Sequence, residues 1–408
     1  MQVARAQMTA PVQVAQNLRA PQLAETVVTA TRSEQPLSDL VADVSIVDRE
    51  TIESSGATGV ADVLARLPGV EITRNGGIGN SSSVYLRGAE SRFTAVYIDG
   101  VRVDSQSTGG ALWEQIPLSQ IERIEVLRGP AAAVYGSDAI GGVIQLFTRK
   151  GEGPAAPYVG VGLGNQGMRK IEAGVSGTAG PDGALDYAVG LAHTRSSGFD
   201  SKASGVHNPD DDGYRSTSAS AKLGYRINAQ HQLGATLLAN RLDSAYDAFT
   251  YLPAAPNDDR NQHRLRTLGA HWAAQWSESY STRVSVSESV SRYETSPPPY
   301  LTETELRGAL WQNQWRLGAH RLSAALERRE DHLNNPALDA YSVGISRSRS
   351  QDGLALGYGY SAGAHTVQAN LRHDDDSEFG GKGTGSLSYG YGFAPGWRAT
   401  ASVGTAFR

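Results

Sequence analysis

The side chains best suited to chemistry in this sequence are acidic residues in two neighbouring polar stretches. They are Asp200, Asp210, Asp212 and the following Gly213 in the first stretch, and Tyr246, Asp247 and Asp258 in the second. Oxygen ligands at alternating positions, followed by a glycine, suit Ca²⁺, which binds roughly six to eight oxygens. Isolated acidic clusters are also common in loops that are merely solvated, so both interpretations are open at this point.

The sequence shows no arrangement of residues typical of an enzyme active site. Residues 136–142, GSDAIGG, resemble a phosphate-binding loop but lack the G-x-G-x-x-G spacing and the P-loop lysine. No serine–histidine–aspartate or paired-glutamate pattern occurs, and the histidines lack metal-binding spacing. They are scattered, with five at His193, His207, His231, His263 and His271. We therefore expect no catalytic residues, and a soluble nucleotide-binding enzyme remains only as an alternative from a different class.

Composition narrows the class of protein further. The 408 residues include no cysteine, which excludes disulfides and thiolate metal sites, and the net charge of −5 argues against a nucleic-acid partner. No run approaches the ~20 apolar residues of a membrane-spanning helix. A membrane β-barrel is still possible, because its alternating strands escape a hydropathy scan.

The elements that would position functional groups fall into two regions, and the first is organised around residues 121–148. This stretch predicts a strand, a turn at Gly129-Pro130, a short helix near Ala131–Val134 and a second strand at Val143–Thr148. Further strands are predicted at Val44–Val47, Val70–Thr73, Ser82–Leu86 and Ala95–Ile98, with short helices beginning at Asp48 and Gly59. The first 150 residues should therefore form one small mixed α/β domain.

After Lys150 the pattern changes to alternating strands. Thirteen are predicted, at Tyr158–Leu163, Met168–Ser176, Leu185–Thr194, Thr217–Tyr225, Gln232–Arg241, Leu265–Trp276, Arg283–Tyr293, Leu306–Trp315, Leu322–Glu327, Gly344–Tyr358, Thr366–Arg372, Gly385–Tyr391 and Trp397–Phe407. Short connections alternate with long polar ones, the latter at Arg195–Arg215, Leu242–Gln262, Glu294–Glu305, Arg328–Ser342 and Asp374–Lys382. Transmembrane barrels have short turns at one end and long loops at the other. A soluble sandwich or propeller is the alternative, but it explains this alternation less well.

The odd number of strands has a consequence for the barrel. An open sheet of this width would leave two edges whose unsatisfied backbone groups lipid does not tolerate. We therefore expect the barrel to need more chain than these 408 residues supply. Aromatic residues at Trp272, Trp276, Trp311, Trp315, Tyr358 and Tyr360 fit either a membrane-interface girdle or ordinary core packing.

The N-terminal residues form a separate region. Residues 1–24 are polar and unpatterned, resemble a weak secretory signal, and predict disorder. The β-prone run Glu25–Ala30 follows. It predicts either the first strand of the next domain or an exposed segment that a partner binds by strand addition.

Several short motifs, taken in order, carry a family resemblance. They are Glu25–Ala30, Asp62–Leu64 with Leu67–Val70, Leu86–Gly88, Tyr97–Arg102, Ile121–Val126, Arg128–Pro130 and Tyr135–Ile144. Together they resemble the TonB-dependent outer-membrane receptors. The resemblance implies a TonB box at 25–31 with Glu25, Thr26, Val27, Val28, Thr29 and Ala30 binding TonB. It also implies a plug domain at 32–150 and, at 151–408, the first 13 strands of a barrel of about 22.

Within this family the sequence is most similar to the vitamin B12 (cobalamin) receptors. The similarity lies at Asn75–Ser82, Arg372–Gly380 and Ser402–Phe407. It implies calcium-ordered loops with ligands from Asp200, Asn208, Asp210, Asp212, Tyr246, Asp247, Ala248 and Asp258. It also implies substrate contacts from the two plug apices, at Ser81, Ser83, Thr108 and Gly109, with Glu90 nearby. A siderophore receptor is the alternative of the same class.

The resemblance implies an active transporter. Cobalamin would bind between plug apices and barrel loops, TonB would capture the box by strand addition, and proton-motive force across the inner membrane would open a path. Charged plug residues need partners if they are buried. We hypothesise that Arg87, Glu122, Glu125 and Arg128 form pairs that lock the plug until force is applied.

Overall fold

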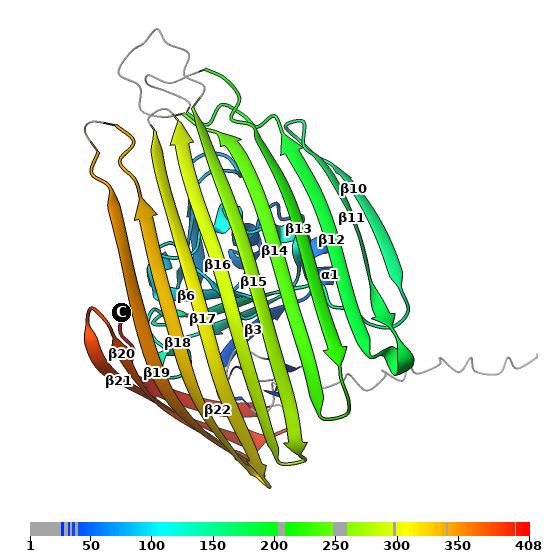
Figure 1. Ribbon diagram of the computed structural model, residues 1–408, viewed down its shortest axis with the longest axis vertical. Helices are drawn as coiled ribbons and strands as arrows, with labels where there is room; N and C mark the ends of the chain where they lie inside the picture. The colour runs from blue at the N-terminus through cyan, green and yellow to red at the C-terminus, as the bar shows by residue number, and fades with distance from the viewer. Residues whose placement is uncertain are drawn as a thin grey trace, which may run out of the picture.

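The computed structural model describes residues 26–27, 32, 35–36, 40–202, 209–247, 259–296, 299–339, 342–395 and 397–408. A single-layer, curved β-sheet forms a wall, and a small α/β domain, the plug, lies on its concave side (Figure 1). The chain passes from the plug to the wall between Thr148 and Ala156. This is the predicted fold of a plug domain followed by antiparallel strands.

The plug is built on a five-stranded sheet of order β3-β8-β9-β6-β7, in which β6 and β9 run parallel. A separate hairpin, β4-β5, packs beside it. The strands are β3 (Asp43–Val47), β4 (Val70–Arg74), β5 (Ser82–Leu86), β6 (Thr94–Ile98), β7 (Val101–Val103), β8 (Ile121–Arg128) and β9 (Gly142–Thr148). The helices are α1 (Arg49–Ser54), α2 (Val60–Leu64) and α3 (Ala132–Tyr135), with single 3₁₀ turns η2 (Ser91–Phe93), η3 (Trp113–Gln115) and η4 (Leu118–Gln120).

Local signals explain these elements. Asp48 caps α1, because its side chain accepts a hydrogen bond from the Thr51 backbone N–H at 2.8 Å. The apolar faces of α2, β5, β6, β8 and β9 form one buried core that includes Leu64, Leu86, Ile124 and Ile144. Among the described residues, no helix is both long and apolar enough to cross a membrane.

The wall has thirteen antiparallel strands, each hydrogen-bonded to its neighbours in sequence order, as predicted. They are β10 (Ala156–Leu163), β11 (Arg169–Ala179), β12 (Leu185–Ser196), β13 (Tyr214–Arg226), β14 (His231–Ala245), β15 (Arg260–Ser277), β16 (Tyr280–Ser296), β17 (Tyr300–Leu317), β18 (His320–Asn335), β19 (Ile345–Ala362), β20 (His365–Asp376), β21 (Gly380–Ala394) and β22 (Trp397–Gly404). A 3₁₀ turn, η5 (Pro181–Gly183), connects β11 to β12. Strands β10 and β22 lie at the two edges of the sheet.

Three of the five predicted long connections are shorter than predicted, because the strands extend into them. β16 runs to Ser296 and β17 begins at Tyr300, so most of the predicted 294–305 loop is strand. Likewise β18 continues to Asn335, and the connection from β20 to β21 covers only residues 377–379. Polar and charged residues occupy both faces of these strand ends, which removes the alternation that marks a strand in sequence.

The outward face of the wall is apolar over its middle and carries aromatic residues toward the short turns. Trp276 is 50% exposed and Trp311 49% exposed, and Tyr280 stacks on Trp315 with ring centroids 5.3 Å apart. Exposed aromatics at one level of the wall fit a membrane-interface girdle better than core packing.

Candidate functional site

The first apex of the plug, residues 75–81, contacts the wall at the end that carries the long connections. The Asn261 side-chain amide at the start of β15 donates to Asn80 Oδ1 at 2.9 Å. Gly79 lies so close to β14 that an added Cβ would stand 2.6 Å from Ser244 Cβ. The apex is closed by the Asn75 N–H, which donates to the Ser81 carbonyl at 3.0 Å.

The second apex, residues 105–110, lies at the same end of the wall. The Gln106 backbone N–H donates to Thr304 Oγ1 at 3.1 Å, and the hydroxyls of Ser107 and Tyr300 lie 2.8 Å apart. Gly110, with φ +88, passes within van der Waals contact of Ser91 and leaves no room for a side chain.

The predicted substrate residues therefore divide into two groups. Ser81 is exposed on the first apex, and Thr108 and the half-buried Gly109 belong to the second. Ser83 is half-buried inside β5, while Glu90 lies beyond the opposite end of β5 from Ser81 and pairs with Arg92 at 2.6 Å. Their contacts with a substrate remain predictions.

A buried ionic network lies beneath the second apex. Arg102 donates to Asp138 at 2.6 Å and to Asp104 at 3.2 Å, and Arg408 lies 3.4 Å from Asp138. Burial alone would raise the pKa of Asp138, but Arg102, Arg329 and Arg408 outweigh it and bring this pKa to about 2. Asp138 is therefore ionised at every physiological pH. Sequence reasoning missed this network, although an aspartate and an arginine close to a plug apex are a usable signal.

The acidic loops lie beside the first apex. The Ala245 N–H donates to the Gly213 carbonyl at 2.8 Å, which joins the two loops, and the buried Asp212 accepts from the Ser201 N–H at 3.1 Å. Asp200 and Asp210 are exposed, and Tyr246 and Asp247 follow β14. Asn208, Ala248 and Asp258 lie outside the described residues. Within the described residues, no three acidic or histidine side chains group closely enough to hold a metal ion.

The described part of the predicted TonB box is a short strand. β1 (Thr26–Val27) pairs with β2 (Gln35–Pro36) and not with the plug sheet, and Val27 is 1% exposed. Glu25, Val28, Thr29 and Ala30 lie outside the described residues.

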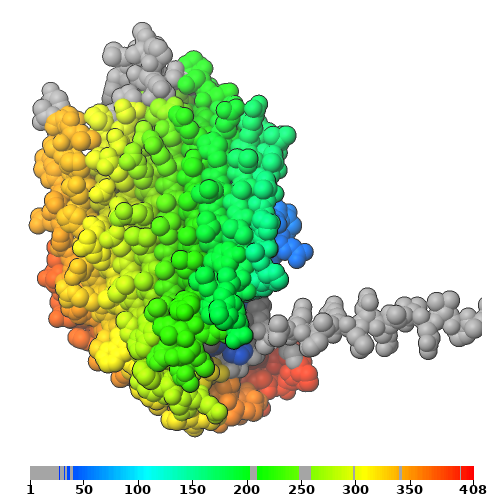
Figure 2. All heavy atoms as spheres, turned by 45° about the vertical axis from the view of Figure 1, so that its right-hand side comes forward, coloured from blue at the N-terminus to red at the C-terminus, as the bar shows by residue number. Residues whose placement is uncertain are grey.

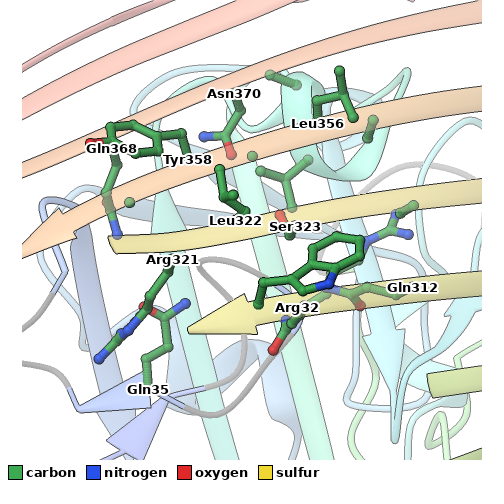
Figure 3. Close-up of a pocket in the computed structure, with 18 of the residues that line it drawn as sticks. Arg32, Gln35, Gln312, Arg321, Leu322, Ser323, Leu356, Tyr358, Gln368 and Asn370 are labelled. Carbon is green, nitrogen blue, oxygen red and sulfur yellow. The ribbon is translucent and has the colours of Figure 1, made fainter. Parts of the chain in front are cut away.

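Arg32 follows this strand and joins the plug to the wall. Its guanidinium lies 3.1 Å from Glu327 of β18 and 4.6 Å above the ring of Tyr135. Gln35 accepts a hydrogen bond from Arg321 at 2.9 Å. Arg32, Gln35 and Arg321 line a cavity of about 100 Å³ between the N-terminal segment and the inward face of β17–β20 (Figure 3).

Glu327 is shared between two arginines. Arg372 of β20 lies 2.9 Å from Glu327 and 2.6 Å from Asp374, and all three side chains are at least nine-tenths buried. Buried charges of this kind are stable only when paired. The sequence signal that could have revealed this cluster is the presence of charged residues at inward positions of β18 and β20. The alternation of the strands alone predicts that these residues face the plug.

The four charged plug residues proposed as a lock have partners within the plug. Arg128 donates to Asp43 at 3.2 Å and to Ser45 at 2.9 Å, and Arg87 pairs with Asp43. Glu122 accepts from the Lys150 N–H at 3.2 Å, and Glu125 lies 2.5 Å from Arg123. Among the described residues, the ion pairs that cross from plug to wall include Asp99–Lys222 at 2.5 Å, Arg49–Glu172 at 3.9 Å, Asp138–Arg408 at 3.4 Å and Arg32–Glu327.

Comparison with known proteins identifies relatives that share this architecture. Residues 36–143 match the TonB-dependent Receptor Plug Domain family. The vitamin B12 transporter BtuB of Photobacterium profundum is 30% identical over 383 residues, which cover 94% of this chain and 62% of that protein.

Solved structures agree on the fold. A ferric enterobactin receptor (PfeA) mutant from Pseudomonas aeruginosa superimposes with a TM-score of 0.77 at 19% identity, covering 94% of this chain and 63% of that one. The FpvAI–pyocin S2 complex gives 0.77 at 15% identity, with coverages of 92% and 57%. The siderophore receptor PirA from Pseudomonas aeruginosa gives 0.69 at 21% identity, with coverages of 88% and 61%.

A plug domain on the concave side of an antiparallel β-wall is the architecture of the outer-membrane receptors that the chain resembles, and it places the chain in the bacterial outer membrane. Residues 36–143 belong to the TonB-dependent receptor plug domain family, and the chain spans 62% of the length of the curated relative that it matches. The relatives that it matches are named as transporters and receptors.

Proposed function

We propose that this receptor imports cobalamin or a related corrinoid across the outer membrane. The observation that carries this proposal is the 30% identity to a vitamin B12 transporter along 94% of the chain. The siderophore receptors share the fold at 15% to 21% identity, which supports the architecture and not a substrate. A ferric siderophore is therefore the second candidate.

The two apices and the long connections would form the binding surface. They lie at one end of the wall, where the first apex contacts β14 and β15 and the second contacts β17. Exposed Ser81 and Thr108 present hydroxyl groups there. A corrinoid carries amide side chains, which such hydroxyl and backbone groups can hydrogen-bond.

Release would depend on the opposite side of the plug. TonB would bind residues 25–30 by strand addition, in which the main chain supplies most of the contact. In the described structure Val27 is buried and Arg32 is ion-paired to the wall. The box must therefore separate from β2, and Arg32 from Glu327, before TonB can pair with the box, and force transmitted by TonB would then displace the plug.

Calcium is the proposed cofactor of the acidic loops. Asp200, Asp210, Asp212 and Asp247, with Asn208, Asp258 and the carbonyls of Tyr246 and Ala248, offer the oxygen donors that Ca²⁺ prefers, from two adjacent loops. When bound, the ion would neutralise these carboxylates and fix the loops over the first apex. Ca²⁺ binding would then precede and strengthen substrate binding.

The test is equilibrium binding to the purified receptor in detergent. Cyanocobalamin should bind, a ferric catecholate siderophore should not, and chelation of Ca²⁺ should weaken cobalamin binding. Asp210→Asn should reproduce the effect of chelation, while Asp182→Asn, on a turn at the opposite end of the wall, should bind as the wild type does. Siderophore binding without cobalamin binding would select the second candidate, and cobalamin binding insensitive to chelation would refute the role of calcium alone.

A further inference from the structure

On strands β11–β16, six arginines occupy directly opposite outward positions close to the upper boundary of the apolar band of the wall. On β11, β12, β14 and β15 this band includes the exposed residues Ile171, Leu191, Leu237 and Leu268. Farther along the same faces, toward the long connections, the outward positions are occupied by arginine. They are Arg169, Arg195, Arg215, Arg241, Arg264 and Arg292. Figure 2 shows this side of the wall, with the green strands toward the viewer.

The strand register places these arginines in two rows of three. Arg169 of β11 lies directly opposite Arg195 of β12, which lies directly opposite Arg215 of β13. Arg241 of β14 lies opposite Arg264 of β15, which lies opposite Arg292 of β16. We call these six residues the arginine rows. Side chains at directly opposite positions start about 5 Å apart, and like charges there are destabilising.

The rows lack the acidic partners that would relieve this repulsion. Within the described part of the chain, Arg169, Arg195, Arg241 and Arg264 are exposed and form no ion pair or hydrogen bond. Only one residue, at the end of each row, has an acidic partner. Arg215 lies 3.9 Å from Asp243, and Arg292 lies 3.0 Å from Glu294 and 3.8 Å from Glu303.

The next strands show that the fold can balance such charges. On β17 and β18 the outward arginines beside the apolar band are paired. Arg307 lies 2.5 Å from Glu305, and Arg328 lies 3.0 Å from Glu330 and 2.9 Å from Asp352. Arg266, an outward arginine of β15 beside the rows, is also paired, at 2.7 Å from Glu288. Among the described residues, the unbalanced outward arginines next to the band are those of the arginine rows on β11–β16.

We propose that the arginine rows bind the phosphate groups of a phosphorylated glycolipid in the outer leaflet of the membrane. The long connections of a transmembrane barrel face the outside, so the rows lie at the level of the outer headgroups. The guanidinium group binds phosphate through two parallel hydrogen bonds, and an anion between facing arginines converts their repulsion into attraction. The apolar band directly below would contact the acyl chains of the same lipid.

The experiment measures lipid binding by the purified receptor in nanodiscs of neutral lipid. The probe is bisphosphorylated lipid A, compared with monophosphorylated lipid A and with free inorganic phosphate. Two double variants each remove the middle residue and the unpaired end of a row, Arg169→Gln/Arg195→Gln and Arg241→Gln/Arg264→Gln. Arg328→Gln is the matched control, because it removes an outward arginine whose charge is already balanced.

The wild type should bind the bisphosphorylated lipid most tightly, with an affinity that falls as salt rises. Each arginine removed should lower the affinity roughly fivefold, as for other cationic side chains at an anionic membrane surface. Arg328→Gln should change it by less than about twofold. Equal loss in Arg328→Gln, no loss in either double variant, or equal affinity for free phosphate would overturn the proposal.

A second measurement separates binding from folding. In neutral detergent without lipid A, both double variants should unfold at the same temperature as the wild type or higher, because each loses a like-charge contact. A lower unfolding temperature would show that the arginines are held by partners within the protein. That result would count against the glycolipid.

Discussion

Glu114 of the plug and His263 of the wall face each other across a buried contact, with Oε1 and Nδ1 3.7 Å apart. The other carboxylate oxygen of Glu114 accepts from the Ser82 N–H at 3.2 Å, at the base of the first apex. The Gln115 amide lies 3.2 Å from His263 Nδ1, and the His263 ring packs on Tyr293. A single carboxyl group thus connects the first apex to strand β15.

From the burial of this carboxyl group we predict that the stability of the plug depends on pH. Burial raises the pKa of Glu114 to about 7, although backbone hydrogen bonds and the nearby Arg74 act to lower it. An unfolded glutamate titrates near 4.3, so between roughly pH 4.3 and 7 the unfolded state releases a proton that the folded state keeps. The stabilisation is present in full below about pH 4 and is lost as the pH rises through 7.

Hydrogen exchange of the segment 75–115 should therefore report a plug that loosens between pH 5 and 8, after correction for the intrinsic rate. In Glu114→Gln this dependence should be absent, because the amide does not titrate. Glu53→Gln, an exposed change on α1, is the control and should keep the wild-type profile. If the protection of this segment from exchange still falls with rising pH in Glu114→Gln, another group causes the effect.

The close approach of Gly79 to β14 predicts a second result. An alanine there would place Cβ 2.6 Å from Ser244 Cβ and 3.0 Å from Tyr214 Cβ, which forces the first apex away from the wall. Gly79→Ala should weaken substrate binding at least tenfold, and about 1–3 kcal/mol of overpacking is the expected cost. Binding titrations would measure this.

A second substitution, at Ser244, tests whether this contact causes the loss of binding. Ser244→Gly removes the side chain that Cβ would meet and should restore much of the affinity in the double variant. If the double variant binds as weakly as Gly79→Ala, the loss arises from the backbone of the apex and not from its fit against the wall.

The sequence predicts elements best where one physical signal dominates. The plug strand Ser82–Leu86 has the predicted bounds, because β-branched and apolar residues alternate between polar turns. The number of wall strands was predicted correctly, but their bounds were not. For β18 the prediction is Leu322–Glu327, whereas the strand in the structure is His320–Asn335. Its upper half, Arg328–Asn335, has charged residues on both faces, and backbone pairing with β17 and β19 keeps it extended.

The candidate sites were predicted less completely, for a different reason. Ser81 and Thr108 reach the apices because glycine-rich loops follow short strands, which is a local pattern. The Asp99–Lys222 and Arg32–Glu327 pairs join residues more than one hundred positions apart. Periodicity fixes which face a side chain occupies, but not the height at which the plug stands inside the wall, and pairing depends on that height.

The Asp138 network predicts a change at the second apex. Asp138→Asn removes the main partner of Arg102 and leaves a buried charge with only Asp104, which typically costs about 3–5 kcal/mol. Hydrogen exchange of residues 104–110 should rise sharply. Because the pKa of Asp138 is about 2, the difference from the wild type should be constant from pH 5 to 8 and vanish only as the pH falls through 2.

Asp43→Asn is the matched control for this variant. Asp43 also pairs with two arginines, Arg87 and Arg128, but it is 47% exposed and distant in sequence from the apex. Its loss should leave exchange at 104–110 unchanged. A similar rise in both variants would indicate general loosening of the plug.

The Arg32–Glu327 pair predicts how the N-terminal strand is held. The sequence contains no cysteine, so Val27→Cys introduces a unique thiol at a side chain that is 1% exposed. Alkylation of this thiol should be slow in the otherwise wild-type receptor. In combination with Arg32→Gln or Glu327→Gln it should accelerate at least tenfold, because removing one member of a buried pair leaves the other charge without compensation.

The control for this measurement is Arg328→Gln, one residue from Glu327 but on the outward face. It should leave the alkylation rate of Val27→Cys unchanged. Rapid alkylation with both Arg32 and Glu327 intact would show that β1–β2 pairing does not bury Val27 in the membrane-inserted receptor. An unchanged slow rate in Arg32→Gln would mean that strand pairing, and not the ion pair, protects the segment that TonB is proposed to bind.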